Sequence, residues 1–141
     1  MEAVSNDGRI LKREDRPFST VKKGFTYFRE GDLLFAKITP CMENGKGAVA
    51  DRLSNGLGFG STEFHVVRPG ARILGKFLFE VMQLPVFRRE AEAKMTGKVG
   101  QKRVPESFLQ NYMIPVPPPE IQKAWACLEK MDTNLGSFAF V

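Results

Sequence analysis

The residues of this sequence that could do chemistry are cationic and amide side chains placed among glycines. Asn44 and Lys46 alternate with Gly45 and Gly47, after an apolar run that carries Lys37 near its end. Glycine lets a backbone come close to a ligand, and lysine supplies a point charge for a phosphate group. Two interpretations stay open, a ligand-binding loop and a hairpin turn at Asn44-Gly45 with solvated lysines, and composition alone favours the turn.

Ser61 and Thr62 form a second candidate group, because they follow glycines at positions 56, 58 and 60. Their hydroxyl groups could donate to phosphate oxygens or to base edges. The plainer interpretation is that they begin a strand and that the glycines mark a tight connection before it.

A third candidate segment spans residues 95–105, and the stretch from Lys94 to Arg103 is basic and contains no acidic residue. This stretch carries four cations and one amide side chain: Lys94, Lys98, Lys102, Arg103 and Gln101. Glutamine can pair bidentately with adenine, and arginine with guanine, when a backbone holds them in a DNA groove. A run of charge is usually a solvated face, but this run has no carboxylates to compensate it, so both interpretations stay open.

Familiar catalytic signatures fail in this sequence. His65 is the only histidine, which excludes a multi-histidine metal site and leaves a catalytic triad a single candidate base. A Walker-type phosphate loop would need glycine where Pro40 stands. We therefore expect no enzyme, no cofactor and no metal in this chain. A small nuclease that uses Glu92 and Lys94 stays an alternative, although these side chains would point about 200° apart on a helix.

Composition limits the class of protein. With 43% hydrophobic and 26% charged residues, the chain is too apolar for disorder, and its 141 residues suit a single domain. Lysine and arginine number 21 against 16 acidic residues, and the resulting charge of +5 permits a polyanionic partner. No apolar run approaches the roughly 18 residues that a membrane-spanning helix needs. Cys41 and Cys127 form no C-x-x-C pair, so we expect reduced thiols and a cytoplasmic protein without membrane contact.

Periodicity predicts an α+β fold. Strands are expected at 8–12, 33–38, 46–50, 62–67 and 112–116. Helices are expected at 75–83, 86–95 and 120–131. Pro85 interrupts the helical pattern, and Pro117–Pro119 form a stiff spacer before the last helix. We expect a mixed, strand-rich N-terminal part with helices packed on it, followed by a short C-terminal helix after the proline-rich spacer.

Four ordered motifs carry a likeness to a known family. They span 30–47, 58–64, 95–105 and the proline-rich stretch 114–118 together with Gln122. In this order they closely resemble the target-recognition region of the DNA specificity (S) subunit of type I restriction-modification systems. The likeness covers nearly the whole chain, and four ordered motifs of this length are far more specific than one short pattern.

The resemblance implies a DNA-binding role without catalysis. An S subunit carries two such recognition domains, and each reads one half of a split double-stranded target. Long helices act as a spacer between them and dock the methyltransferase (M) subunits, which bind S-adenosylmethionine and methylate adenine. A separate restriction (R) subunit translocates and cuts DNA. By this likeness the present chain needs no cofactor, because S-adenosylmethionine would be bound by the partner M subunit.

The likeness also divides the chain into a target-recognition domain, 1–116, and a proline-rich lead-in to a truncated spacer helix, 117–141. This lead-in reads Pro119-Glu120-Ile121-Gln122, where the family usually has Glu directly before Gln. Only one recognition domain is present, and the helical pattern meets Gly136 early. We therefore expect a truncated product or fragment, for which the alternative to DNA recognition is a non-DNA-binding assembly or dimerisation piece.

The expected site residues fall into two groups. Those expected to contact DNA are Lys37, Asn44, Lys46, Ser61, Thr62, Lys98, Gln101, Lys102 and Arg103. The cations among them would hold phosphates, whereas Gln101, Ser61 and Asn44 would reach base edges. Those expected to contact an M subunit, or a second copy in a homodimer, are Ile121, Trp125 and Leu128 on the C-terminal helix.

Overall fold

The computed structural model describes the backbone of residues 1–134 and the side chains of residues 1–127. The helices of this range are α1 (Phe18–Val21), α2 (Gly75–Gln83), α3 (Pro85–Ala93), α4 (Glu106–Asn111) and α5 (Pro119–Asn134). Its strands are β1 (Thr26–Arg29), β2 (Leu33–Ala36), β3 (Gly47–Val49), β4 (Leu57–Gly60) and β5 (Phe64–Val67), and a short 3-10 turn, Ser54–Gly56, precedes β4. None of the described helices combines the length and apolar character that crossing a membrane requires.

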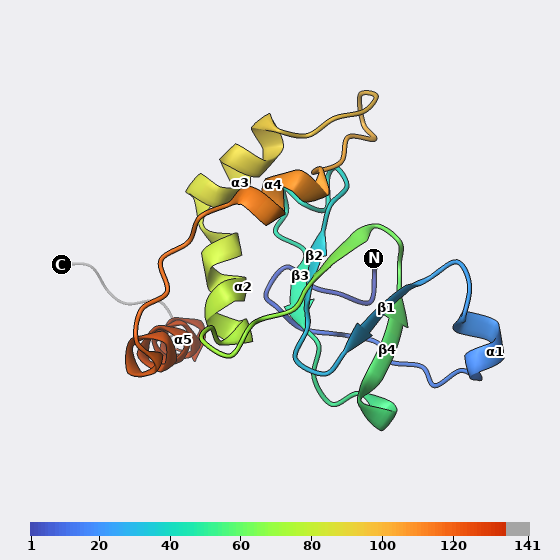
Figure 1. Cartoon of the computed structure of the whole chain (residues 1–141), viewed down its shortest axis with the longest axis horizontal. Helices are drawn as coiled ribbons and strands as arrows, with labels where there is room; N and C mark the ends of the chain where they lie inside the picture. Colours follow the sequence, from blue (N-terminus) through green and yellow to red (C-terminus); the bar gives the residue numbers. More distant parts are fainter. Residues whose placement is uncertain (135–141) are drawn as a thin grey trace.

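Two antiparallel strand assemblies form the centre of the molecule (Figure 1). The larger is a three-stranded sheet in the order β3-β2-β5, in which Leu33 of β2 lies opposite Val49 of β3 and Val67 of β5. The smaller is a ribbon of β1 and β4, in which Thr26 lies opposite Gly60. Figure 1 shows α2 and α3 on one side of the sheet and the β1–β4 ribbon on the other.

Strand β2 is buried on both faces, because its residues alternate between two apolar clusters. Leu33 and Phe35 join the cluster under α2 and α3, where the ring of Phe87 meets Phe35 edge-on at 5.8 Å. Leu34 and Ala36 join the second cluster, on the side of the β1–β4 ribbon. This alternation has the period of two that a strand imposes. A continuous apolar run therefore becomes a central strand with helices on one face and a β layer on the other.

The ribbon packs closely because β4 lacks side chains where the core needs space. Gly58 lies opposite Phe28, and a Cβ atom at Gly58 would overlap the buried Phe28 ring. The bend and the close backbone approach expected at these glycines are confirmed at Gly56 and Gly58, but Gly58 and Gly60 belong to a strand that was not expected. Periodicity could not reveal β4, since its inward positions carry no side chain.

Most of the expected elements are confirmed. The strands expected within 33–67 correspond to β2, β3 and β5, and the helix expected at 75–83 has the same bounds as α2. Leu84 leaves the helical conformation with a ψ of 134°, and Pro85 becomes the first residue of α3, a position that suits a residue without an N–H. Pro119 likewise begins α5. The α+β class is confirmed.

Two expected strands are wrong, and two short helices, α1 and α4, and strands β1 and β4 were not expected. Residues 8–12 form only isolated bridges, with Val4 and Ala48. Residues 112–116 pair with no strand of the described chain, because Ile114 packs instead against the cluster under α2 and α3. Helix α4 was missed because its six residues are too few to show a helical period.

Candidate nucleic-acid interface

Three loops meet at one end of the central sheet, in the upper part of Figure 1. They are the β2–β3 loop (37–46), the β4–β5 turn (61–63) and the part of the α3–α4 connection at 96–103, and we call them together the three-loop surface. The Lys37 N–H donates to the Glu63 carbonyl at 3.0 Å, and the Thr39 N–H donates to the Lys102 carbonyl at 3.0 Å. Segments far apart in the sequence are therefore joined by their backbones.

A side-chain ion pair closes the same junction. Arg103 donates from Nε and Nη2 to the two carboxylate oxygens of Glu63 at 2.9 and 2.7 Å, and from Nη1 to the Gln101 carbonyl at 2.8 Å. The hydrogen bonds from Arg103 and the charges of Arg103 and Lys37 lower the pKa of Glu63, against the opposing effect of burial. The charge of Arg103 is thus already matched within the protein, and the pair holds two loops together.

The β2–β3 connection is a folded loop and not the hairpin turn that composition favours. The Asn44 N–H donates to the Pro40 carbonyl at 3.0 Å, and the Gly45 N–H donates to the Met42 carbonyl at 2.9 Å. These turn-like bonds occupy the backbone within 37–46, and pairing with β2 resumes only at Lys46, whose carbonyl accepts from the Ala36 N–H at 3.1 Å. The chain therefore does turn at Asn44-Gly45 between two paired strands, but within a longer folded loop and not as a two-residue hairpin turn.

Residues 96–103 form a closed loop that projects from the surface. Thr96 and Arg103 exchange backbone hydrogen bonds of 3.0 and 2.8 Å at its base, and the Gln101 N–H donates to the Lys98 carbonyl at 2.9 Å within it. Its exposed side chains include Lys98, Val99, Gln101 and Lys102. The ammonium groups of Lys98 and Lys102 have no partner among the described residues, so this loop presents free positive charge.

The other expected DNA contacts lie on the same loops and differ in availability. Lys37 is half-buried beside Glu63. Lys46 is directed to the N-terminus, because its ammonium group lies 3.4 Å from the carbonyl of Met1. The Ser61 hydroxyl oxygen accepts a hydrogen bond from the Glu63 N–H at 3.1 Å. Of the expected DNA contacts on the β2–β3 loop and the β4–β5 turn, Asn44 and Thr62 are exposed.

Helix α5 is attached to the body by a buried amide. The Gln122 side chain is fully buried; its Oε1 accepts from the Leu74 N–H at 2.8 Å, and its Nε2 donates to the carbonyls of Arg72 and Pro117 at 2.9 and 2.7 Å. One turn further, the ring of Trp125 meets Phe77 of α2 edge-on at 5.7 Å. Of the expected partner contacts, Ile121 and Trp125 remain 53% and 40% exposed, and the side chain of Leu128 lies outside the described residues.

The titratable groups of the described chain do not gather into a metal site. No group of three or more His, Cys, Asp or Glu side chains that could hold a metal ion occurs there. His65 lies on β5, and its Nε2 is 2.8 Å from the Val104 carbonyl. This hydrogen bond gives His65 a structural partner beside the three-loop surface.

Comparison with known proteins supplies the family. No family model matches the sequence, but curated relatives do. The chain is 47% identical over 111 residues to the type I restriction enzyme EcoAI specificity subunit of Escherichia coli, which covers 78% of this chain and 19% of that protein. It is 45% identical over 107 residues to the EcoEI specificity subunit of the same organism, which covers 75% of this chain and 18% of that protein.

The chain belongs to the type I specificity-subunit family. It spans about a fifth of the length of the curated relatives that it matches. It is therefore similar to one domain-sized part of such a subunit.

The fold of this specificity-subunit domain also occurs in solved structures. The crystal structure of the HsdS subunit from Thermoanaerobacter tengcongensis matches with a TM-score of 0.75 and 22% identity, over 94% of this chain and 34% of that chain. A chain from work on complex assembly and conformational transition of the type I R-M system matches with a TM-score of 0.74, at the same identity and coverage. At this identity the likeness concerns the fold alone.

Sequence reasoning missed the residues that hold this specificity-subunit domain together. Asp32, at the start of β2, accepts from the Arg29 N–H at 2.8 Å and from the Arg68 guanidinium at 2.8 and 2.7 Å. Like Glu63 and Gln122, it lies inside a recognised motif and had been given no role. A polar residue within a motif, with no surface function assigned to it, was the available signal for these internal contacts.

Proposed function

We propose that this chain binds double-stranded DNA through the three-loop surface and reads one half of a split target. The observation that carries the proposal is the meeting of the β2–β3 loop, the β4–β5 turn and residues 96–103, which backbone hydrogen bonds and the Glu63–Arg103 pair hold in one place. A loop set fixed by its own contacts can present polar groups to a duplex in one register, as sequence reading requires.

The charges on this surface suggest separate tasks. Lys98 and Lys102 are exposed and free of partners among the described residues, so they suit contacts to phosphates. Gln101, Asn44 and Thr62 expose groups that can hydrogen-bond with base edges. Arg103 has its donors already engaged, and we assign it to holding the loops and not to phosphate binding.

The proposal includes the partners of a type I system. In it, the chain catalyses nothing and directs an adenine methyltransferase subunit, which binds S-adenosylmethionine, and a restriction subunit to DNA in the cytoplasm. Residues 1–116 serve as the recognition domain, and 117–141 lead into the helix that contacts partners. The similarity to the EcoAI and EcoEI specificity subunits supports this assignment.

The salt dependence of duplex binding tests the proposal. Fluorescence anisotropy with a labelled duplex should give a log-log slope of affinity against salt near −2 if Lys98 and Lys102 each neutralise about one phosphate. Replacing Lys98 and Lys102 together by Gln should reduce the steepness by about 2. The matched control replaces Arg72 and Lys123, two exposed cations near the start of α5, by Gln. An affinity independent of salt, or equal slopes in both double variants, contradicts the proposal.

A second candidate function is assembly without DNA binding. The observation that favours it is the exposure of Ile121 and Trp125 on α5, since large apolar side chains at a helix surface suit contact with another protein. Light scattering after size exclusion, with and without a methyltransferase subunit, distinguishes the two. If the chain stays a monomer and does not bind the methyltransferase subunit, the assembly function is excluded.

A further inference from the structure

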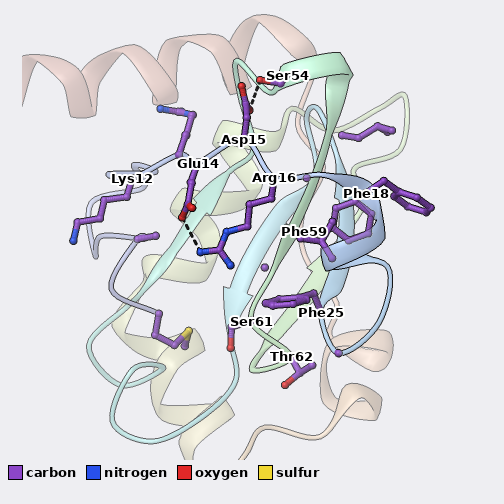
Figure 2. Close-up of a pocket in the computed structure, with 18 of the residues that line it drawn as sticks. Lys12, Glu14, Asp15, Arg16, Phe18, Phe25, Ser54, Phe59, Ser61 and Thr62 are labelled. Atoms are coloured by element: carbon purple, nitrogen blue, oxygen red, sulfur yellow. Dashed lines mark hydrogen bonds and ion pairs between the residues drawn. The ribbon is translucent and has the colours of Figure 1, made fainter.

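A wide groove runs along the outer side of the β1–β4 ribbon, away from α2 and α3. Its volume is about 1160 Å³, and it lies between the N-terminal segment 12–16 and the aromatic residues of α1, β4 and the α1–β1 turn. Figure 2 shows Ser61 and Thr62 at one end of the groove and Ser54 at the other. Since Ser61 and Thr62 also belong to the three-loop surface, the groove adjoins the proposed duplex-binding site without being part of it.

One wall of the groove consists of exposed aromatic rings. Phe18 and Phe25 are 68% and 44% exposed. The ring of Phe59 lies 6.0 Å from Phe18 and 5.6 Å from Tyr27, which continues the aromatic surface along the ribbon. The strand period of two places Tyr27 and its pairing partner Phe59 outside, because it turns Phe28 into the core. Contiguous exposed aromatic surface is rare in a folded domain unless something binds to it.

The groove carries charge of both signs. Its lining includes Lys12, Arg13 and Arg16 and the carboxylates of Glu2, Glu14 and Asp15. Of these three carboxylates, only Glu14 pairs with a cation of the described chain. Glu14 pairs with Arg16 at 2.7 Å, and a carboxylate oxygen of Asp15 accepts from the Ser54 hydroxyl at 2.7 Å (Figure 2). Positive charge remains available. Lysines without a partner among the described residues lie in the groove or between two residues that line it: Lys12, Lys22 and Lys23.

We propose that this groove binds an unpaired stretch of nucleic acid, with bases stacked on Phe18, Phe25 and Phe59 and phosphates toward the three lysines. Aromatic rings beside a cationic track are the recurring arrangement of single-strand binding sites, because every base has a face that can stack. Bases inside a duplex cannot reach such rings, so this site differs in its ligand from the three-loop surface. The serine and threonine hydroxyls at its ends and the backbone at Gly58 and Gly60 can hydrogen-bond with sugar and phosphate oxygens.

Binding of a single strand by the full chain tests this proposal. The probes are a fluorescein-labelled oligothymidylate and a strand that contains 2-aminopurine, whose fluorescence falls on stacking. Phe18→Ala and Phe25→Ala should each weaken single-strand binding roughly 5- to 150-fold, the range for loss of one stacked base, and should reduce quenching. Phe18→Trp should preserve both. Met113→Ala, which removes a 90% exposed side chain outside the groove, should change neither.

Different variants test the two proposed sites, so one proposal can be contradicted without the other. Lys98 and Lys102 variants should weaken duplex binding and leave single-strand binding unchanged, whereas Phe18→Ala should do the reverse. The groove proposal is overturned if oligothymidylate binds no more weakly to Phe18→Ala and Phe25→Ala than to the original chain. It is also overturned if these variants lose affinity for a methyltransferase subunit and keep their affinity for single strands, since the groove is then a protein contact. Circular dichroism melting identifies any variant that has lost its fold.

Discussion

Arg103 donates two hydrogen bonds of 2.9 and 2.7 Å to the carboxylate of Glu63, which lies 40 residues away in the sequence. The two side chains are 43% and 25% exposed, so water screens the pair only in part. Each residue also sits beside a backbone junction: the Glu63 carbonyl accepts from Lys37, and Arg103 bridges to Ile38. The pair therefore fixes the three-loop surface to the end of the sheet, whereas charge composition alone would assign Arg103 to DNA contact.

Removing the negative charge of this pair should loosen the 96–103 loop. Glu63→Gln is expected to lower the free energy of unfolding by about 0.5–1 kcal/mol, since the pair is partly exposed. It should also accelerate hydrogen exchange at the Thr96 and Arg103 amides, which close the loop. Glu92→Gln, the same substitution at an exposed residue of α3, should leave exchange unchanged. Equal exchange in the two variants would show that the ion pair does not hold the loop.

The Asp32–Arg68 pair should make stability depend on acid pH. Burial raises the pKa of Asp32. The hydrogen bonds from Arg68 and the Arg29 N–H, together with the charges of the two arginines, lower this pKa by more than burial raises it, so the net shift is downward. A lowered carboxyl pKa stabilises the fold above the unfolded value of about 3.9, and this contribution is lost as pH falls through the folded pKa.

Asp32→Asn tests this linkage. It should lower the free energy of unfolding by about 2 kcal/mol at pH 7, less than for a fully buried pair because the Arg68 side chain is 52% exposed. The difference from the original chain should shrink toward pH 3. Urea denaturation across this range measures it, with the exposed Asp51→Asn as control. A difference that stays constant with pH contradicts the assigned role.

Loss of the Gln122 amide should detach α5 from the body. Gln122→Ala removes three hydrogen bonds and leaves the Leu74 N–H without its partner, at an expected loss of about 2–3 kcal/mol. Trp125 is the only tryptophan and packs on Phe77, so its emission should shift to the red as the helix separates. Lys123→Ala, an exposed neighbour, is the control. Unchanged emission in Gln122→Ala would refute the anchoring role.

A side chain at Gly58 should disturb the second cluster. Gly58→Ala places a methyl group into the ring of Phe28 and should lower the free energy of unfolding by about 1–3 kcal/mol. Adding Phe28→Leu should recover part of this loss by making room. Gly70→Ala, where no atom lies within 4 Å of the added carbon, should stay within about 0.5 kcal/mol. Thermal unfolding measures all three, and a neutral Gly58→Ala would show that β4 does not pack against Phe28 as described.

Local patterns determined much of the fold. The helical period and the missing N–H of Pro85 place α2 and α3, and the apolar run at 33–38 predicts β2, because these signals depend only on neighbours in the sequence. Local signals misled where strand pairing decides the structure. Residues 112–116 are an apolar stretch but have no partner strand in the described chain, and the glycines of β4 remove the side chains that would show its period.

The candidate site divides in the same way. The sequence by itself determined the family likeness and the motifs that contain the three loops, since both are read from residue order. Only the tertiary structure decided that Arg103 is engaged by Glu63, that Lys46 is directed to Met1, and that Gln122 is buried. The physical reason is that a side chain's charge and polarity are properties of its residue, whereas its partner is chosen by packing between segments far apart in the chain.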